Sequence, residues 1–107
     1  MTIIEGNIVT RMDPKAEYDE KDYGFRYGPK GLATGDTLIA STWEIRDSAD
    51  DSISTDLVII SATIIDSAKT SQVWLRGGIA GKTYKITNFI TTAGGRKQAL
   101  AFLLPVV

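Results

Sequence analysis

The side chains that could do chemistry in this sequence are mainly carboxylates. Asp47, Asp50 and Asp51 stand close together in one polar segment, and carboxylates grouped on a loop can bind calcium. A twelve-residue calcium loop also needs glycine at its sixth position and glutamate at its twelfth, and this segment offers neither. The pattern therefore predicts a solvated acidic loop over 47–54 and no metal site.

Other catalytic chemistry is limited by the residues that are missing. The chain has no His and no Cys, which excludes Ser-His-Asp and Cys-His catalysis and metal binding by imidazole or thiolate. The run Gly77-Gly78-Ile79-Ala80-Gly81 lacks the Lys-Ser/Thr pair of a phosphate-binding loop. No pair of carboxylates stands out as a glycosidase pair. We therefore predict no enzyme, no cofactor and turn chemistry for the glycines.

Composition narrows the function classes further. The 107 residues carry 12 Lys and Arg against 13 Asp and Glu, a net charge of −1, so the basic surplus that favours nucleic-acid binding is missing. No apolar run approaches the roughly 20 residues that span a bilayer. The N-terminus has no basic start and no long apolar run, so it does not read as a secretory signal. A chain without cysteine also suits a reducing compartment.

Strand signals dominate the rest of the chain. Short runs rich in Ile, Val, Thr and Tyr are separated by turn residues, which is typical of an all-β domain. We predict an immunoglobulin-like (Ig-like) antiparallel β-sandwich of about seven strands over residues 13–107. Residues 1–12 form an N-terminal segment that is flexible alone or paired in an assembly. The expected strands are 8–12, 18–27, 37–46, 57–65, 71–76, 83–92 and 97–106.

Alternation along three of these strands predicts the core. Tyr23, Phe25 and Tyr27 share one face of their strand. In 37–46, the face with Ile39, Ser41, Trp43 and Ile45 is expected to face inward, because the opposite face ends in charge. Trp43 and Tyr84 are the core markers. Tyr84 follows a glycine turn, where a tyrosine hydroxyl can bond back to the backbone and fix a corner of the sandwich.

Apolar residues that alternation leaves on outer faces predict an interaction surface. Strand 57–65 is apolar on both faces, so it is either central and covered or faces a partner. Trp74 lies opposite Val73 and Leu75, on a face with Gln72 and Arg76. Exposed aromatic rings also allow an alternative function, a module that binds surface carbohydrate by stacking. The candidate interaction residues are Ile4, Ile8, Val58, Ile60, Ile64 and Trp74.

Two blocks of residues carry a resemblance to a known family. The first is Gly35-Asp36-Thr37-Leu38-Ile39-Ala40-Ser41-Thr42-Trp43-Glu44-Ile45. The second is Val73-Trp74-Leu75-Arg76-Gly77-Gly78, followed by Gly81-Lys82-Thr83-Tyr84, Thr87-Asn88, Thr91-Thr92 and Gly95-Arg96. With Asp13-Pro14 and Tyr18-Asp19 upstream, the chain resembles small Ig-like virion structural proteins of tailed phages and prophages, of the fiber-tail adaptor type. Segment 47–69 is longer than in the family pattern.

The resemblance implies a structural role in a virion. The protein would dock onto tail, fiber or head-tail components through its surfaces. Its partners would be other virion proteins and copies of itself, with neither nucleic acid nor membrane involved. It would be synthesised in the bacterial host cytoplasm and then mounted in the particle. The resemblance brings no catalytic residues.

Overall fold

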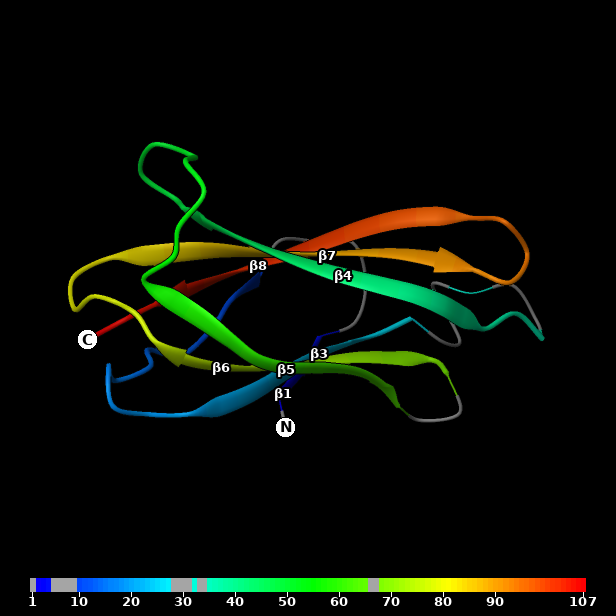
Figure 1. The fold of residues 1–107 in the computed structure, drawn as a ribbon, viewed down its shortest axis with the longest axis horizontal. Coiled ribbons are helices and arrows are strands. Elements are labelled where there is room, and N and C mark those ends of the chain that lie inside the picture. The colour runs from blue at the N-terminus through cyan, green and yellow to red at the C-terminus, as the bar shows by residue number, and fades with distance from the viewer. Residues whose placement is uncertain (1, 5–9, 28–31, 33–34, 66–67) are drawn as a thin grey trace.

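Two β-sheets packed face to face make up the protein (Figure 1). The computed structural model describes residues 2–4, 10–27, 32, 35–65 and 68–107. One sheet holds, in spatial order, β1 (Thr2–Ile4), β3 (Lys21–Arg26), β6 (Thr70–Gly77) and β5 (Leu57–Ile65). The other holds β2 (Thr10–Arg11), β8 (Lys97–Pro105), β7 (Thr83–Thr92) and β4 (Leu38–Asp47). Within the described ranges there is no helix long and apolar enough to cross a membrane.

The order of the strands is that of an immunoglobulin domain. A constant-type Ig domain places strands A, B, E and D in one sheet and strands C, F and G in the other. Matching β3 to β8 with B to G in chain order gives A-B-E-D for the first sheet and G-F-C within the second. The six long strands pair antiparallel. The predicted Ig-like sandwich is therefore confirmed.

The strand count differs slightly from the prediction. The described part of the chain contains eight strands instead of about seven, because the N-terminal segment contributes β1 in addition to β2, which lies within the predicted strand 8–12. β1 pairs parallel with β3, and β2 pairs parallel with β8. These additions lie at one side of the sandwich, so the N-terminal segment covers the outer edges of β3 and β8.

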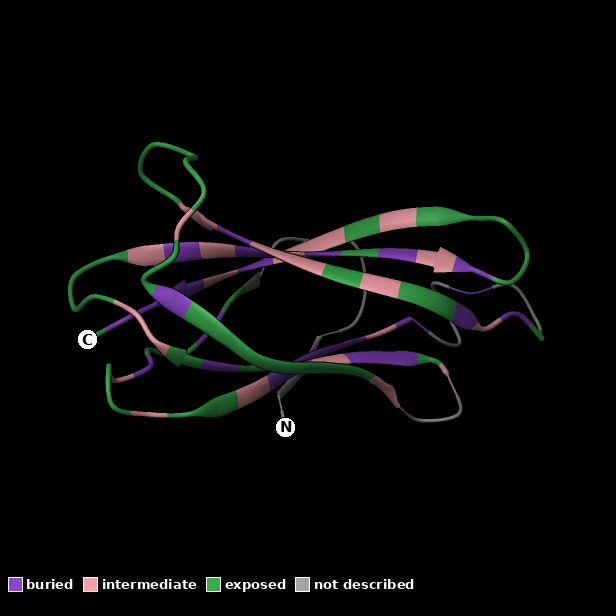
Figure 2. Cartoon of the chain, viewed as in Figure 1, coloured by how far each residue is buried: buried purple, intermediate pink, exposed green. Residues whose placement is uncertain are grey.

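Aromatic rings fill the space between the sheets. Figure 2 marks the buried residues along the strands in purple. Tyr23, Phe25 and Tyr27 are all buried, as the alternation predicted. The Phe102 ring from the opposite sheet lies 5.2 Å from that of Tyr23 and 5.7 Å from that of Phe25, between ring centroids. Rings at these separations pack favourably beyond the area that they bury. This aromatic cluster ties the two sheets together.

The predicted inner face of β4 is only partly right. Ile45 is buried and Trp43 is half-buried, with its ring stacked on that of Phe25 at 5.9 Å. Ile39, however, is 63% exposed, and its neighbour Leu38 is buried instead. The cause is a β-bulge between Leu38 and Ala40, since one extra residue reverses the alternation at the start of the strand.

Strand β5 also departs from simple alternation. It lies at the edge of its sheet, hydrogen-bonded to β6 on one side, so it is not a central strand. A second bulge, between Ile59 and Ser61, separates its two halves. Val58 and Ile64 therefore fall on different faces: Val58 is exposed, whereas Ile64 packs against the core. Ile64 is thus wrongly placed among the surface candidates.

A buried polar network links the two sheets deep inside the aromatic core. Asn88 of β7 is fully buried, and its side-chain oxygen accepts a hydrogen bond of 2.9 Å from the Tyr27 hydroxyl. Its amide nitrogen donates to Ser41 Oγ at 2.8 Å and to the Thr42 carbonyl oxygen at 3.0 Å. Ser41 Oγ in turn lies 2.5 Å from Ser71 Oγ of the first sheet. Because these polar groups are hydrogen-bonded to one another, the fold avoids the free-energy cost of a buried polar group without a partner.

Lys15 forms a second polar link between the sheets. The residue is fully buried, and its ammonium group donates to the Ala16 and Gly77 carbonyl oxygens at 2.8 Å each. Its backbone bonds the end of β8, because Lys15 N–H donates to the Pro105 carbonyl. Burial lowers the pKa of this amine by disfavouring the charged form. Lys15 therefore fastens the segment after β2 to the ends of β6 and β8.

Burial of Tyr23 predicts a loss of stability at alkaline pH. Burial, with smaller contributions from Asp19 and Asp22, raises the pKa of this phenol to about 12. An unfolded tyrosine ionises near pH 10, so the contribution of Tyr23 is complete below about pH 10 and disappears as the pH rises toward 12. We expect the free energy of unfolding to fall by about 2–3 kcal/mol over this interval because of Tyr23. Urea titrations at successive pH values measure it.

The matched control for this prediction is Tyr23→Phe. Phenylalanine keeps the ring that packs on Phe102 but cannot ionise. The variant should therefore lose less stability between pH 10 and 12 than the wild type. Equal losses in the two proteins would show that Tyr23 ionises as freely in the folded state as in the unfolded one.

Candidate docking surfaces

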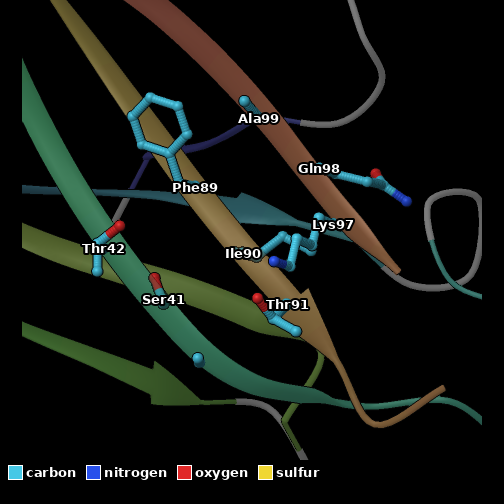
Figure 3. A pocket seen from close by; sticks show the side chains of 9 residues that line it. Ser41, Thr42, Phe89, Ile90, Thr91, Lys97, Gln98 and Ala99 are labelled. Atoms are coloured by element: carbon cyan, nitrogen blue, oxygen red, sulfur yellow. The ribbon is translucent and has the colours of Figure 1, made fainter. Parts of the chain in front are cut away.

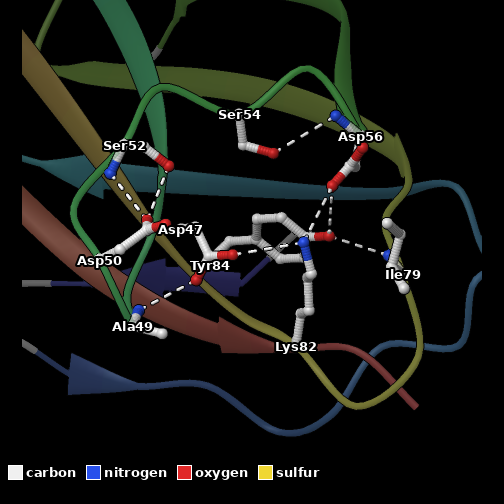
Figure 4. Close-up of polar contacts among 9 residues, drawn as sticks. All are labelled: Asp47, Ala49, Asp50, Ser52, Ser54, Asp56, Ile79, Lys82 and Tyr84. Carbon is white, nitrogen blue, oxygen red and sulfur yellow. Dashed lines mark hydrogen bonds and ion pairs between the residues drawn. The ribbon is translucent and has the colours of Figure 1, made fainter.

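A network of charges shapes the loop between β4 and β5 (Figure 4). Lys82 Nζ lies 3.4 Å from an Asp47 carboxylate oxygen and 3.6 Å from one of Asp56, at the two ends of the loop. The hydrogen bond with Asp47 is the main reason that the pKa of Lys82 is raised. Since Lys82 precedes β7, this ammonium group holds the β4–β5 loop against the β6–β7 corner.

Tyr84 also stabilises the β6–β7 corner. It is fully buried, and its hydroxyl oxygen accepts a 2.9 Å hydrogen bond from the Ile79 backbone N–H, five residues upstream. The hydroxyl also donates to Asp56 at 3.5 Å. This is the tyrosine corner of Ig-like sandwiches, in which the hydroxyl at the start of strand F bonds back to the preceding loop. Burial raises the pKa of Tyr84, so the hydroxyl stays protonated at neutral pH.

The acidic loop uses its carboxylates to bond its own backbone. Asp47 accepts from the Ala49 N–H, and Asp50 accepts from both the N–H and the hydroxyl of Ser52. The hydrogen bonds from Ser52 lower the pKa of Asp50. Over the residues that the structure describes, no group of three His, Cys, Asp or Glu side chains is arranged to hold a metal ion. The Asp47 and Asp50 carboxylates therefore stabilise turns of this loop, and Asp47 also pairs with Lys82.

The glycines after β6 serve backbone geometry. Gly77 and Gly78 have φ angles of 80° and 94°, in the left-handed region that other residues avoid. A Cβ atom on Gly78 would also lie 2.8 Å from Val106 Cγ2, closer than carbon atoms pack. These two constraints explain the Gly-rich sequence without a phosphate ligand.

Three of the predicted interaction residues are exposed on two neighbouring strands of the first sheet. Val58 and Ile60 of β5 are 37% and 45% exposed, and Trp74 of the adjacent strand β6 is 38% exposed. We call these three residues the docking patch. Ile4 belongs to β1, and its side chain is outside the described set, as is the whole of Ile8.

An apolar groove runs along the open side of the sandwich, between the edge strands β4 and β5. Its volume is about 480 Å³. Trp43 lines it, and the buried indole N–H of Trp43 has no acceptor among the described residues. The remaining lining residues include Ile45, Ile53, Leu57, Val58 and Ile59. Sequence reasoning missed this groove, because its position depends on which strands occupy the sheet edges.

A shallow hollow on the outer face of the second sheet was also missed (Figure 3). It has a volume of about 380 Å³ and is formed by β4, β7 and β8 around Phe89. Phe89 is 43% exposed, while Asn88 and Ile90 beside it are buried. Alternation along β7 could have revealed it, because Tyr84, Ile86 and Ile90 point inward and Phe89 must then point outward.

Comparison with known proteins gives one family. A family model described as podophage GP4 fiber-tail adaptor protein gp77 matches residues 15–105, which is most of the chain. No curated protein matches. The matched region includes the six long strands, the Tyr84 corner, the docking patch and the groove. The chain belongs to the podophage fiber-tail adaptor family and is a structural protein of a phage tail.

Proposed function

We propose that this chain is a non-catalytic Ig-like module, made in the host cytoplasm, that docks onto tail and fiber proteins of its virion through the docking patch. The observation that carries the proposal is the exposure of Val58, Ile60 and Trp74 on two neighbouring strands. Aromatic side chains are enriched at protein–protein interfaces, where tryptophan often anchors the contact. Family membership supports tail and fiber proteins as the partners.

Carbohydrate binding has less support than protein docking. Stacking on sugars favours several aromatic rings on one exposed surface. Trp43 faces the core from the second sheet and stacks on Phe25, whereas Trp74 lies on the outside of the first sheet. The two indoles therefore do not form one platform.

Trp74→Ala should weaken docking by at least about tenfold, because losing a buried anchor at an interface costs roughly 2 kcal/mol or more. The assay mixes the purified chain with the purified tail and fiber proteins of its phage and measures the dissociation constant for each. The matched control is Phe89→Ala, which removes an exposed ring from the opposite sheet and should leave binding unchanged. If Phe89→Ala abolished binding and Trp74→Ala did not, the docking surface would be the second sheet.

A further inference from the structure

The charges of this chain are divided between its surfaces. Among the described residues, most carboxylates lie in two segments, 13–22 and 47–56. The outer face of the second sheet instead carries one carboxylate, that of Glu44, and four cationic side chains, those of Arg11, Arg46, Lys85 and Lys97. Four positive charges and one negative charge give this face +3, whereas the whole chain carries −1. The second sheet is therefore the basic side of the sandwich.

Register places three of these cationic residues in one row across the sheet. Lys85 stands between two fully buried residues of β7, so its side chain points away from the core. It is paired with Arg46 of β4 on one side and with Leu103 of β8 on the other, and Leu103 is paired with Arg11 of β2. We call Arg11, Lys85 and Arg46 the basic row. Neighbouring strands are about 4.8 Å apart, so the row spans about 14 Å from β2 to β4.

The stability of the sheet does not explain the basic row. Lys85 lies directly opposite Arg46, and like charges in this position on neighbouring strands are destabilising. Arg46 has an ion pair with Glu44. Within the described chain, however, the side chains of Lys85 and Arg11 form neither a hydrogen bond nor an ion pair. Natural proteins break such local rules mainly at functional sites. The basic row is therefore a candidate binding surface.

An acidic protein surface fits the basic row. A guanidinium group binds a carboxylate through two parallel hydrogen bonds, and complementary charges steer protein partners together. Leu103, which is half-buried between Arg11 and Lys85, offers the apolar contact that protein interfaces combine with charge. Nucleic acid fits less well, because duplex DNA carries a charge about every 1.7 Å and would be repelled by the carboxylates of 47–56, which follow Arg46 directly.

We propose that the basic row binds an acidic surface of a second virion protein, distinct from the partner of the docking patch. The basic row and Trp74 lie on the outer faces of opposite sheets, so one compact partner cannot cover both (Figure 1). The proposal takes from the proposed function only that the partners are tail and fiber proteins. Phe89 lies about 13 Å along β7 from Lys85, outside the row, so Phe89→Ala remains a control for the docking patch.

The experiment reverses one charge of the row with Lys85→Glu. Dissociation constants are measured for each purified tail and fiber protein of its phage, at about 0.05 M and about 0.3 M salt. Lys85→Glu should weaken the binding of one of these proteins about tenfold at the lower salt, because repulsion replaces attraction. The wild-type affinity for the same protein should fall as salt is added, because ions screen the charges. Lys69→Glu, which makes the same charge change in the exposed turn between β5 and β6, should leave this affinity unchanged.

Further measurements separate binding from folding. Lys85→Glu places a carboxylate opposite Arg46, so its melting temperature should equal or exceed that of the wild type. Lys85→Arg keeps the charge and should keep the affinity. Poly-L-glutamate should displace the partner from the wild type, whereas duplex DNA at the same concentration of charge should not.

The proposal is wrong if Lys85→Glu and Lys69→Glu have equal effects on every tail and fiber protein. It is also wrong if Lys85→Glu lowers the melting temperature, which would make Lys85 a residue of the fold, or if DNA displaces the partner as well as poly-L-glutamate does. Trp74→Ala should leave the protein that responds to Lys85→Glu fully bound, so the docking patch and the basic row succeed or fail separately. If both changes weakened the same protein only, there would be no second partner.

Discussion

Phe102→Ala is expected to lower the free energy of unfolding by about 3–5 kcal/mol, the usual cost of removing a phenylalanine from a protein core. Phe102 has no exposed surface, and its ring contacts Tyr23 and Phe25 of the opposite sheet. The change thus removes apolar burial and leaves a cavity between the sheets. Urea unfolding followed by circular dichroism measures the difference from the wild type.

Phe89→Ala is the matched control for Phe102→Ala. The chemical change is the same, but Phe89 lies on the outer face of β7 and keeps 43% of its surface exposed. Its removal should cost about 1 kcal/mol or less, because little apolar surface returns to water. If the two variants were destabilised equally, Phe102 would not lie at the centre of the core.

Where the strands alternate regularly, the sequence predicted the fold well. Tyr23, Phe25 and Tyr27 stand two residues apart, and all three are buried, because β3 pairs with β6 without interruption. Tyr84 follows a glycine turn, which predicted a corner of the sandwich at this point. In the structure its hydroxyl accepts a hydrogen bond from the Ile79 backbone N–H. At these residues the local pattern agrees with the tertiary structure, so the pattern was sufficient to predict where they lie.

The residues that the alternation pattern assigned to the wrong face lie at or beyond the two bulges. Neither the Leu38–Ala40 bulge nor the Ile59–Ser61 bulge contains proline or glycine, and both lie in apolar β-branched surroundings that read as regular strand. Whether a bulge forms depends on the register with the partner strand. The alternation pattern of one sequence carries no information about that register. The exposure of Ile39 and the partial burial of Ile64 therefore could not be predicted.

The candidate docking surface could not be placed from the sequence for a similar reason. The apolar character of 57–65 is visible in the sequence, but its place at a sheet edge follows from the order β1-β3-β6-β5. Lys15 presents the same difficulty, because it stands in a polar stretch beside Pro14 and its hydrogen-bond partner Gly77 is 62 residues away. Long-range pairing decides both cases. The local pattern marked 57–65 as a candidate surface without placing it, and it gave no signal for Lys15.

The buried network around Asn88 gives the second large prediction. Asn88→Ala should lower the free energy of unfolding by about 3 kcal/mol, because it leaves the buried Tyr27 hydroxyl without its acceptor and removes the two hydrogen bonds that the Asn88 amide donates. The Tyr27 hydroxyl loses its acceptor, and Ser41 Oγ loses a donor. Burial raises the pKa of Tyr27, so the phenol cannot offset this loss by ionising at neutral pH. Urea unfolding at neutral pH provides the measurement.

A double-mutant cycle with Tyr27→Phe separates the hydrogen bond from the rest of the network. Tyr27→Phe alone should cost about 1–2 kcal/mol, since Asn88 Oδ1 then lacks its buried donor. Combined with Asn88→Ala, it should cost less than the sum of the two single changes, because the hydroxyl that Asn88→Ala strands is no longer present. Additive losses would mean that Tyr27 and Asn88 do not stabilise each other. The two sheets would then be joined at this point by the aromatic cluster and by the contact between Ser41 Oγ and Ser71 Oγ, and Asn88 would owe its burial to Ser41 and Thr42.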